Sequence, residues 1–252
     1  MRMMTDKDSE EFHQMVEKLK EKKMRRNNCY KYPTTKRETI DGLRHYDMGK
    51  EKLPSVTTIL DKTQTAEKRE SLRAWQERVG LEQAEKIKDE AAERGTAMHK
   101  ILEKYIVDVG YVDLTHVGKA AHNMAIQIIQ SGLINVTEFY GTECTLHYPG
   151  LYAGQTDLVG IHKGKDAIID FKQTNKPKRR EWIDDYCLQL AAYAMAHNFI
   201  YKTKIEKGVI MMCSKDNFYQ EFVVEGKEFQ KYKHNFLRRV DEYYKTRHKT
   251  TG

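Results

Sequence analysis

The sequence lacks the features that mark several large classes of protein. No apolar run approaches the roughly 18 to 20 residues that a membrane-spanning helix needs. The four cysteines include no C-x-x-C pair, so the sequence supports neither a zinc site nor a cysteine-ligated iron–sulfur cluster. A G-x-x-x-x-G-K-[ST] loop is also missing, which excludes a fused motor of the P-loop type. We therefore expect a globular protein with no membrane partner.

Residues 1–14, MRMMTDKDSEEFHQ, contain acidic side chains and no apolar stretch. A secretory signal requires an apolar segment, and organelle transit peptides are poor in acidic residues. We therefore expect neither kind of targeting segment. Because Cys29, Cys144, Cys187 and Cys213 form no paired motif, a reducing, cytoplasmic location is the simplest prediction.

The charge that is present is mostly positive. Lysine and arginine total 44 residues against 37 aspartates and glutamates, which gives a formal net charge of +7. This balance fits a polyanionic partner such as nucleic acid, although solvated lysine faces produce the same count. Hydrophobic residues make up 39% of the 252 residues, enough for the core of one large domain or of one core domain with appendages.

The hydrophobic periodicity changes character near residue 137. Before it, the pattern predicts a β-hairpin within residues 29–50, which contain an Asp-Gly pair. Helices are expected over 8–26, from near Ser55, up to Gly80, over 81–93, from 94 onward and over 117–131. Beyond residue 137 we expect strands over 138–148, 152–162 and 166–172, a helix over 181–199, strands over 207–214 and 219–224, and a helix over 228–249. This order predicts one α/β domain with a helical N-terminal region.

The predicted hairpin over 154–178 carries Asp157, Asp170 and Lys172. If its turn is centred between residues 163 and 164, Asp157 lies opposite Asp170, and like charges in that arrangement repel each other. A divalent cation between the two carboxylates would turn the repulsion into attraction, since hard cations such as Mg²⁺ take carboxylate oxygens. The Phe171 carbonyl could add an oxygen ligand. Lys172, next to it, could hold the attacking water and neutralise a phosphate.

The alternative interpretation is an exposed, charged hairpin. An acid-x-Lys triplet is weak evidence in so charged a chain, because Glu21–Lys23 and Glu225–Lys227 fit it as well. The context favours a site, since the triplet ends an apolar strand and follows a G-x-x-D strand. It also precedes a helix that carries Gln189 and Tyr193 at i, i+4 spacing, on one face.

A series of short motifs occurs in order through residues 94–213. They are RGTAMH with His99, TECTL with Glu143, GQTDLVG with Asp157, IIDFK with Asp170 and Lys172, and QLAAY with Gln189 and Tyr193. This series resembles the PD-(D/E)XK nuclease superfamily and its RecB-type exonuclease branch. LPSVTTIL, Trp75 and DFKQTNKPK make the chain most similar to a group within it, the mitochondrial genome maintenance exonuclease and its phage-encoded relatives.

The resemblance implies a fold and a domain organisation. The expected core, over 94–252, is a mixed central sheet flanked by helices, with the predicted C-terminal helix at its end. Residues 1–93 would form an N-terminal helix, a hairpin and a helical arch region. A phage or bacterial setting fits the acidic N-terminus better than a mitochondrial one, so for a phage-encoded protein the cytoplasm would be that of the host.

The resemblance also assigns roles to the site residues. It implies that His99, Asp157, Asp170 and the Phe171 carbonyl bind Mg²⁺ or Mn²⁺, and that Lys172 positions the water nucleophile. The side chains of Gln189 and Tyr193 would support the site, and Glu143 would take a catalytic role that varies among relatives. One departure is Gln173, where relatives often have threonine. The iron–sulfur members of the family are excluded by the missing cysteine pattern.

Nucleic-acid contacts are predicted at two places outside the metal site. The run KPKRR, which contains Lys176, Lys178, Arg179 and Arg180, follows the active-site strand and could bind phosphates, which fix register without reading sequence. The alternative interpretation is that these charged side chains only form a solvated part of the surface. Trp75 could stack on a base or pack into the core.

The resulting prediction is a metal-dependent DNA exonuclease that acts on single-stranded DNA with free ends. Two alternatives stay open. One is a duplex-DNA recombination exonuclease, and the other is a non-catalytic nucleic-acid-binding module with a decayed nuclease site.

Overall fold

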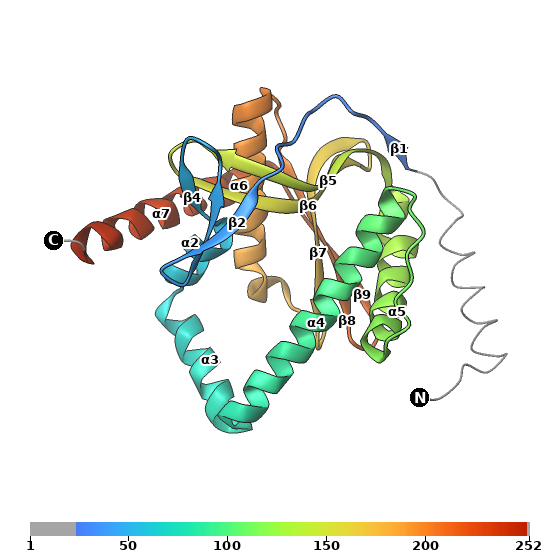
Figure 1. The fold of residues 1–252 in the computed structure, drawn as a ribbon, viewed down its shortest axis with the longest axis horizontal. Coiled ribbons are helices and arrows are strands. Elements are labelled where there is room, and N and C mark those ends of the chain that lie inside the picture. Colours follow the sequence, from blue (N-terminus) through green and yellow to red (C-terminus); the bar gives the residue numbers. More distant parts are fainter. Residues whose placement is uncertain (1–23, 251–252) are drawn as a thin grey trace.

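A six-stranded mixed sheet forms the centre of the computed structural model, which describes residues 24–250, with side chains up to Arg247 (Figure 1). Its strands, in spatial order, are β1 (Arg25–Arg26), β5 (Val136–Tyr148), β6 (Tyr152–His162), β7 (Lys165–Thr174), β8 (Lys207–Ser214) and β9 (Tyr219–Glu225). Strand β1 pairs parallel with β5 and β7 pairs parallel with β8, whereas the other neighbours are antiparallel. A parallel pair needs a crossover, which here is the helix between β7 and β8.

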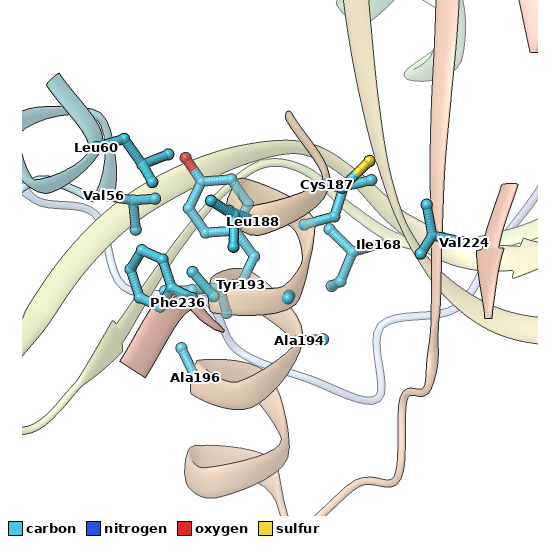
Figure 2. Close-up of a cluster of buried hydrophobic side chains, with 14 of the residues drawn as sticks. Val56, Leu60, Ile168, Cys187, Leu188, Tyr193, Ala194, Ala196, Val224 and Phe236 are labelled. Carbon is cyan, nitrogen blue, oxygen red and sulfur yellow. The ribbon is translucent and has the colours of Figure 1, made fainter. Parts of the chain in front are cut away.

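Helices cover both faces of this sheet. The helices are α2 (Val56–Lys62), α3 (Ala66–Val79), α4 (Leu81–Ile106), α5 (His116–Ser131), α6 (Asp184–Tyr201) and α7 (Gly226–Thr250), with short 3₁₀ turns η1 (Leu133–Asn135) and η2 (Arg180–Trp182). All of these α-helices except α3 contribute buried residues to the cores on the sheet. Helices α4 and α5 share one hydrophobic core with the sheet, and α2, α6 and α7 share the other. Figure 2 shows Leu60, Leu188 and Phe236 of the second core meeting from three helices. The predicted mixed sheet flanked by helices is confirmed.

Strand β7 is apolar because side chains on both of its faces are buried. Ala167, Ile169 and Phe171 face the core of α4 and α5, as the pattern predicts. Ile168 faces the opposite core, under α6, so both faces of the strand are buried. Strands covered on both faces read as nearly continuous hydrophobic runs. No helix among residues 24–250 combines the length and apolar character that crossing a bilayer requires.

The predicted N-terminal hairpin is present as a separate three-stranded sheet. It consists of β2 (Lys36–Ile40), β3 (Leu43–Asp47) and β4 (Lys52–Pro54). Asp41 and Gly42 form the two-residue turn with φ of 51° and 72°. Positive φ at both positions is what a tight hairpin turn demands, and Asp-Gly supplies it at low cost.

Two helix predictions are corrected by the structure. The helices expected over 81–93 and from 94 onward are one helix, α4. Gly95 does not break it, although glycine costs a helix about 1 kcal/mol. A Cβ at Gly95 would lie 3.2 Å from the Gln173 side chain, so the glycine lets α4 approach β7 closely. The helix expected over 8–26 lies mostly outside the described residues, and Arg25–Arg26 form β1 instead.

The segment from α2 to the first half of α4, residues 56–93, is called the arch here. None of the residues in α3 is buried, and α3 and α4 meet at Gly80, whose φ is 85°. In Figure 1 the two helices form a V that projects from the rest of the molecule. Residue 93, the predicted domain boundary, lies inside α4, and α2 belongs to the core under α6. The division into 1–93 and 94–252 stays a proposal.

A partly buried ion-pair network, in which Lys163 is exposed, fastens β9 to the β6–β7 turn. Glu221 lies 2.7 Å from the Lys163 ammonium and 3.3 Å from His162 Nε2. Burial raises the pKa of Glu221, but the hydrogen bonds with His162 and Lys163 outweigh it and lower the pKa from 4.5 to about 2. An acid with a lowered pKa stabilises the fold above its unfolded pKa and loses that contribution as the pH falls through its folded pKa.

We therefore expect Glu221→Gln to lower the free energy of unfolding by about 2 to 3 kcal/mol at pH 6. The difference from the wild type should shrink as the pH falls from 4.5 toward 2, because Glu221 becomes protonated there. Urea unfolding at several pH values measures this. Glu225→Gln, which removes a more exposed partner of Lys165, is the control and should change little. A pH-independent effect of Glu221→Gln would contradict the assignment.

Candidate active site

Three adjacent strands bring carboxylates to the same place. The β6–β7 pairing ends at Leu158 and Ile169, so Asp157 and Asp170 are the next positions along the predicted register. On the other side of β6, Glu143 is the β5 residue that faces Asp157 in the register. Glu143 has a φ of 49°, which is uncommon for a residue other than glycine and costs free energy.

His99 reaches this group from α4. Its Nδ1 lies 3.1 Å from Asp157 Oδ1, and the other Asp157 oxygen accepts a hydrogen bond of 2.6 Å from the Phe171 N–H. One potential ligand atom from each of His99, Glu143 and Asp157 lies within 4.8 Å of the other two. Two carboxylates and an imidazole at this spacing fit a divalent cation, which would cancel the repulsion between the acids.

Protonation in this group follows from burial and mutual attraction. Burial raises the pKa of Glu143, and the nearby charge of Asp157 raises it further, to about 7. Burial also acts to raise the pKa of Asp157, but the interaction with His99 outweighs it, so the pKa is lowered. For His99, burial lowers the pKa and Asp157 raises it, and the net direction is upward.

Asp170 and Lys172 form a second, buried pair next to the first group. Asp170 Oδ2 contacts the Lys172 ammonium, and the two side chains are 4% and 19% exposed. Burial raises the pKa of Asp170 to about 6 even though Lys172 pulls it down. The pKa of Lys172 is raised, because Asp170 and Asp157 outweigh the effect of burial. Its ammonium also lies 5.1 Å from the centre of the Tyr186 ring.

Gln189 and Tyr193 lie on adjacent turns of α6 and are joined by a hydrogen bond of 2.9 Å from Gln189 Nε2 to the Tyr193 hydroxyl. A Cβ at Gly154 would lie 2.5 Å from the Tyr193 ring, so the glycine of GQTD makes room for it. Both α6 residues face a cavity of about 620 Å³. That cavity is also lined by the predicted residues His99, Glu143, Asp157, Asp170 and Lys172.

Gln173, the residue that departs from the family motif, is hydrogen-bonded to helix α4. Arg94 of α4 is buried, and its Nε donates a hydrogen bond of 3.0 Å to Gln173 Oε1. Gln173 Nε2 donates in turn to the Ala91 carbonyl at 2.9 Å, and Arg94 also reaches Asn175. These bonds fasten α4 to β7 beside the cavity.

The predicted DNA-binding residues do not form one surface with the cavity. Trp75 and Lys178 line a separate groove of about 1580 Å³ between α3 and α7. The basic run is partly occupied: Arg180 pairs with Glu228 at 2.6 Å, and Arg179 lies over the Trp182 ring. Lys176 is exposed and lines neither space.

Several residues of the cavity were not predicted from the sequence. Arg37, Arg44 and Tyr46 of the hairpin line it, as does Gln155 of β6. Gln155 Nε2 donates to the Glu143 carbonyl at 2.8 Å, which holds the strained residue in place. Alternation could have indicated Gln155, because it shares a strand face with Asp157. Nothing in the local sequence shows that the hairpin packs beside the cavity.

Named relatives share much of this chain. It is 32% identical over 208 residues to mitochondrial genome maintenance exonuclease 1 of Mus musculus, which covers 76% of this chain and 59% of that protein. The protein of the same name from Xenopus tropicalis is 30% identical over 175 residues, covering 65% and 49%. The one from Homo sapiens is 28% identical over 200 residues, covering 76% and 58%. The chain thus spans about half to three fifths of the length of these relatives.

Similarity to solved structures is lower, and no family model matches the chain. A candidate exonuclease from Eubacterium rectale is 14% identical with a TM-score of 0.45, covering 61% of this chain and 64% of that one. An alkaline exonuclease from Laribacter hongkongensis is 12% identical with a TM-score of 0.27, covering 62% and 84%. Scores this low carry no functional argument. Over about two thirds to three quarters of its length, the chain is thus a homologue of proteins named mitochondrial genome maintenance exonuclease 1, the group that its sequence motifs resemble.

Proposed function

We propose that this chain is a divalent-metal-dependent deoxyribonuclease that hydrolyses phosphodiester bonds from the ends of DNA. The observation that carries the proposal is the single cavity in which His99, Glu143 and Asp157 form a cation-sized group beside the Lys172–Asp170 pair. The kinship with proteins named exonucleases supports the same activity. A cluster of acids next to a buried lysine is suited to phosphate chemistry, because it combines a cation site with a fixed positive charge.

The cation would be Mg²⁺ or Mn²⁺, which prefer oxygen ligands and accept an imidazole in the case of Mn²⁺. His99, Asp157 and Glu143 would hold it, and Asp170 with the Phe171 carbonyl completes the set that the family motif implies. When bound, such a cation supplies positive charge to a phosphate oxygen and lowers the pKa of water. Glu143 must be ionised to take part, which its pKa of about 7 permits near neutral pH.

The protein's own side chains supply positioning and charge. Because its pKa is raised, Lys172 stays an ammonium at neutral pH and acts as a donor that orients water and neutralises phosphate, not as a base. Asp170 keeps that ammonium in place. The Gln189–Tyr193 pair also lines the cavity and would offer the phosphate a hydroxyl.

The substrate we propose is single-stranded DNA with a free end. Both ends of the arch flank the cavity, since Val56 and Thr57 of α2 and Ala91 and Ala92 of α4 line it. Trp75 of the arch, half-buried in the groove beside α3, would stack on a base, and Lys178 and Arg179 would contact phosphates. Leu188 lines that groove and Gln189 lines the cavity, so the two spaces approach each other along α6.

The compartment we propose is reducing. All four described cysteines are free thiols, which fits the cytoplasm, or that of the host if the protein is phage-encoded.

Removal of metal tests the activity. With end-labelled single-stranded DNA, we expect cleavage in Mg²⁺ or Mn²⁺ and a loss of about 10³-fold in excess EDTA, because the cation contributes several kcal/mol to the transition state. Restoring Mg²⁺ should restore the rate. Faster loss of duplex ends than of single strands would favour the recombination-exonuclease alternative. DNA binding without cleavage in any metal would favour the non-catalytic module.

A further inference from the structure

One face of the β2–β3–β4 hairpin looks into the candidate active site. Arg37, Arg44 and Tyr46 line the cavity, and the register pairs Arg37 with Tyr46 and Arg44 with Thr39. Since side chains alternate along a strand, these four residues share one face. Lys36, the immediate neighbour of Arg37, is on the opposite face.

The hairpin is held firmly against the body. The Arg44 carbonyl accepts hydrogen bonds from the Ser55 N–H at 2.9 Å and from the Thr58 hydroxyl at 3.0 Å. Tyr46 and Leu53 are buried in a small core with Ala153 of β6. The two arginines are therefore displayed from a rigid support, which lowers the entropic cost of using them.

Both arginines of this face are exposed, and Arg37 interacts with the Tyr46 side chain on the same face. Neither Arg37 nor Arg44 belongs to an ion pair with a carboxylate among residues 24–247. Arg37 is near enough to Glu143 to oppose the rise in its pKa that burial causes. Lys100, one residue after His99, adds a third cation to the cavity and lies 4.6 Å from the centre of the Tyr111 ring. Exposed cations at the edge of a pocket that holds carboxylates are suited to binding an anion that enters from outside.

We infer that the hairpin face is a phosphate clamp, in which Arg37 and Arg44 each bind a backbone phosphate of the strand that enters the cavity. A phosphodiester backbone fits because its anions repeat at short intervals, and the planar guanidinium fork matches phosphate oxygens. The inference rests on the proposed function for the identity of the strand. It moves the main phosphate contacts from the run at 176–180 to the hairpin.

The test is a binding measurement that needs no catalysis. Fluorescence anisotropy of a labelled single-stranded oligonucleotide, in EDTA, would be recorded over a range of salt for the full chain. For Arg37→Gln with Arg44→Gln we expect weaker binding and a log–log salt slope that is smaller by about 1.4, at about 0.7 per phosphate contact. The matched control is Lys36→Gln with Lys52→Gln, which removes two charges from the opposite face of the same hairpin.

Equal effects of the two double variants would overturn the clamp, because then only net charge matters. A second probe, an oligonucleotide with uncharged methylphosphonate linkages, should bind the arginine variant and the wild type alike. A persisting difference on that probe would show that the arginines do not read phosphate. The thermal unfolding of each variant is measured as a control, to show that weaker binding does not result from loss of the fold. A protein that binds as predicted but cuts nothing in Mg²⁺ would refute the proposed nuclease and leave the clamp standing.

Discussion

Lys172→Met is expected to reduce cleavage by about 10² to 10³-fold while the fold persists. The loss follows from removing a preorganised charge at the phosphate, which is worth several kcal/mol in a site sheltered from water. The fold should survive because Asp170 already has a pKa of about 6 with Lys172 beside it. Without the lysine, Asp170 takes up a proton near neutral pH, and no uncompensated buried charge remains.

The companion variant is Asp170→Asn. Asparagine keeps the shape but leaves the Lys172 ammonium without its counter-ion, and breaking a buried pair on one side costs about 3 to 5 kcal/mol. We therefore expect this variant to lose activity and also stability, whereas Lys172→Met loses activity alone. The double variant should be hardly less active than either single one, since groups that act as a unit are not additive.

The measurement combines a gel assay of cleavage with urea unfolding followed by circular dichroism. Lys165→Met is a matched control, because Lys165 is at the exposed start of the same strand and pairs with Glu225 on the surface. Lys165→Met should cut like the wild type. Near-normal cleavage by Lys172→Met would remove the lysine from the mechanism.

Covalently closed circular single-stranded DNA is expected to survive under conditions that destroy a linear strand of the same sequence. The arch joins the body at both ends, through α2 in the core and through the bonds of Arg94 to Gln173 and Asn175. A strand that must pass beneath it needs an end to insert. Contacts beneath the arch are expected to be indifferent to sequence, since stacking on Trp75 is worth about 1 to 3 kcal/mol for any base.

The comparison uses circular and linear molecules of equal length with Mg²⁺, followed on a denaturing gel. Linearising the circle at one site should make it as sensitive as the linear strand. Trp75→Ala should slow degradation of the linear strand and leave the resistance of the circle unchanged. Degradation of circle and line at similar rates would exclude threading and indicate an open cleft.

The relative position of Asp157 and Asp170 could be predicted from the sequence, because a short hairpin turn determines it. The β6–β7 register follows from a two-residue turn at Lys163–Gly164, where φ is positive at both positions, and it places Asp157 and Asp170 correctly relative to each other. By contrast, the group closest to His99 includes Glu143. Its position depends on the pairing of β5 with β6 and on an unusual φ, and neither leaves a signal in composition or periodicity.

Long-range contacts explain the remaining differences. The sequence of residues 176–180 suggests unpaired positive charges, but in the structure Arg180 pairs with Glu228, 48 residues later in the chain. The helices over 81–93 and from 94 read as two because Gly95 separates a charged from an apolar segment. In the structure Gly95 instead gives room to Gln173, which lies on β7, far away in the sequence.

Because α4 is one continuous helix, its exposed half and the half that carries His99 move as one rigid body. Its 26 residues span about 39 Å at 1.5 Å per residue, with the tip of the arch at one end. Arg94, which is tied to Gln173 and Asn175, lies near the middle of the helix, and His99 is little more than one turn beyond it, in the half that packs on the sheet. We expect a tilt of the exposed half about Arg94 to shift His99 relative to Asp157. In the proposed enzyme, a strand bound under the arch and the alignment of the proposed ligand His99 would thus be linked through one rigid helix.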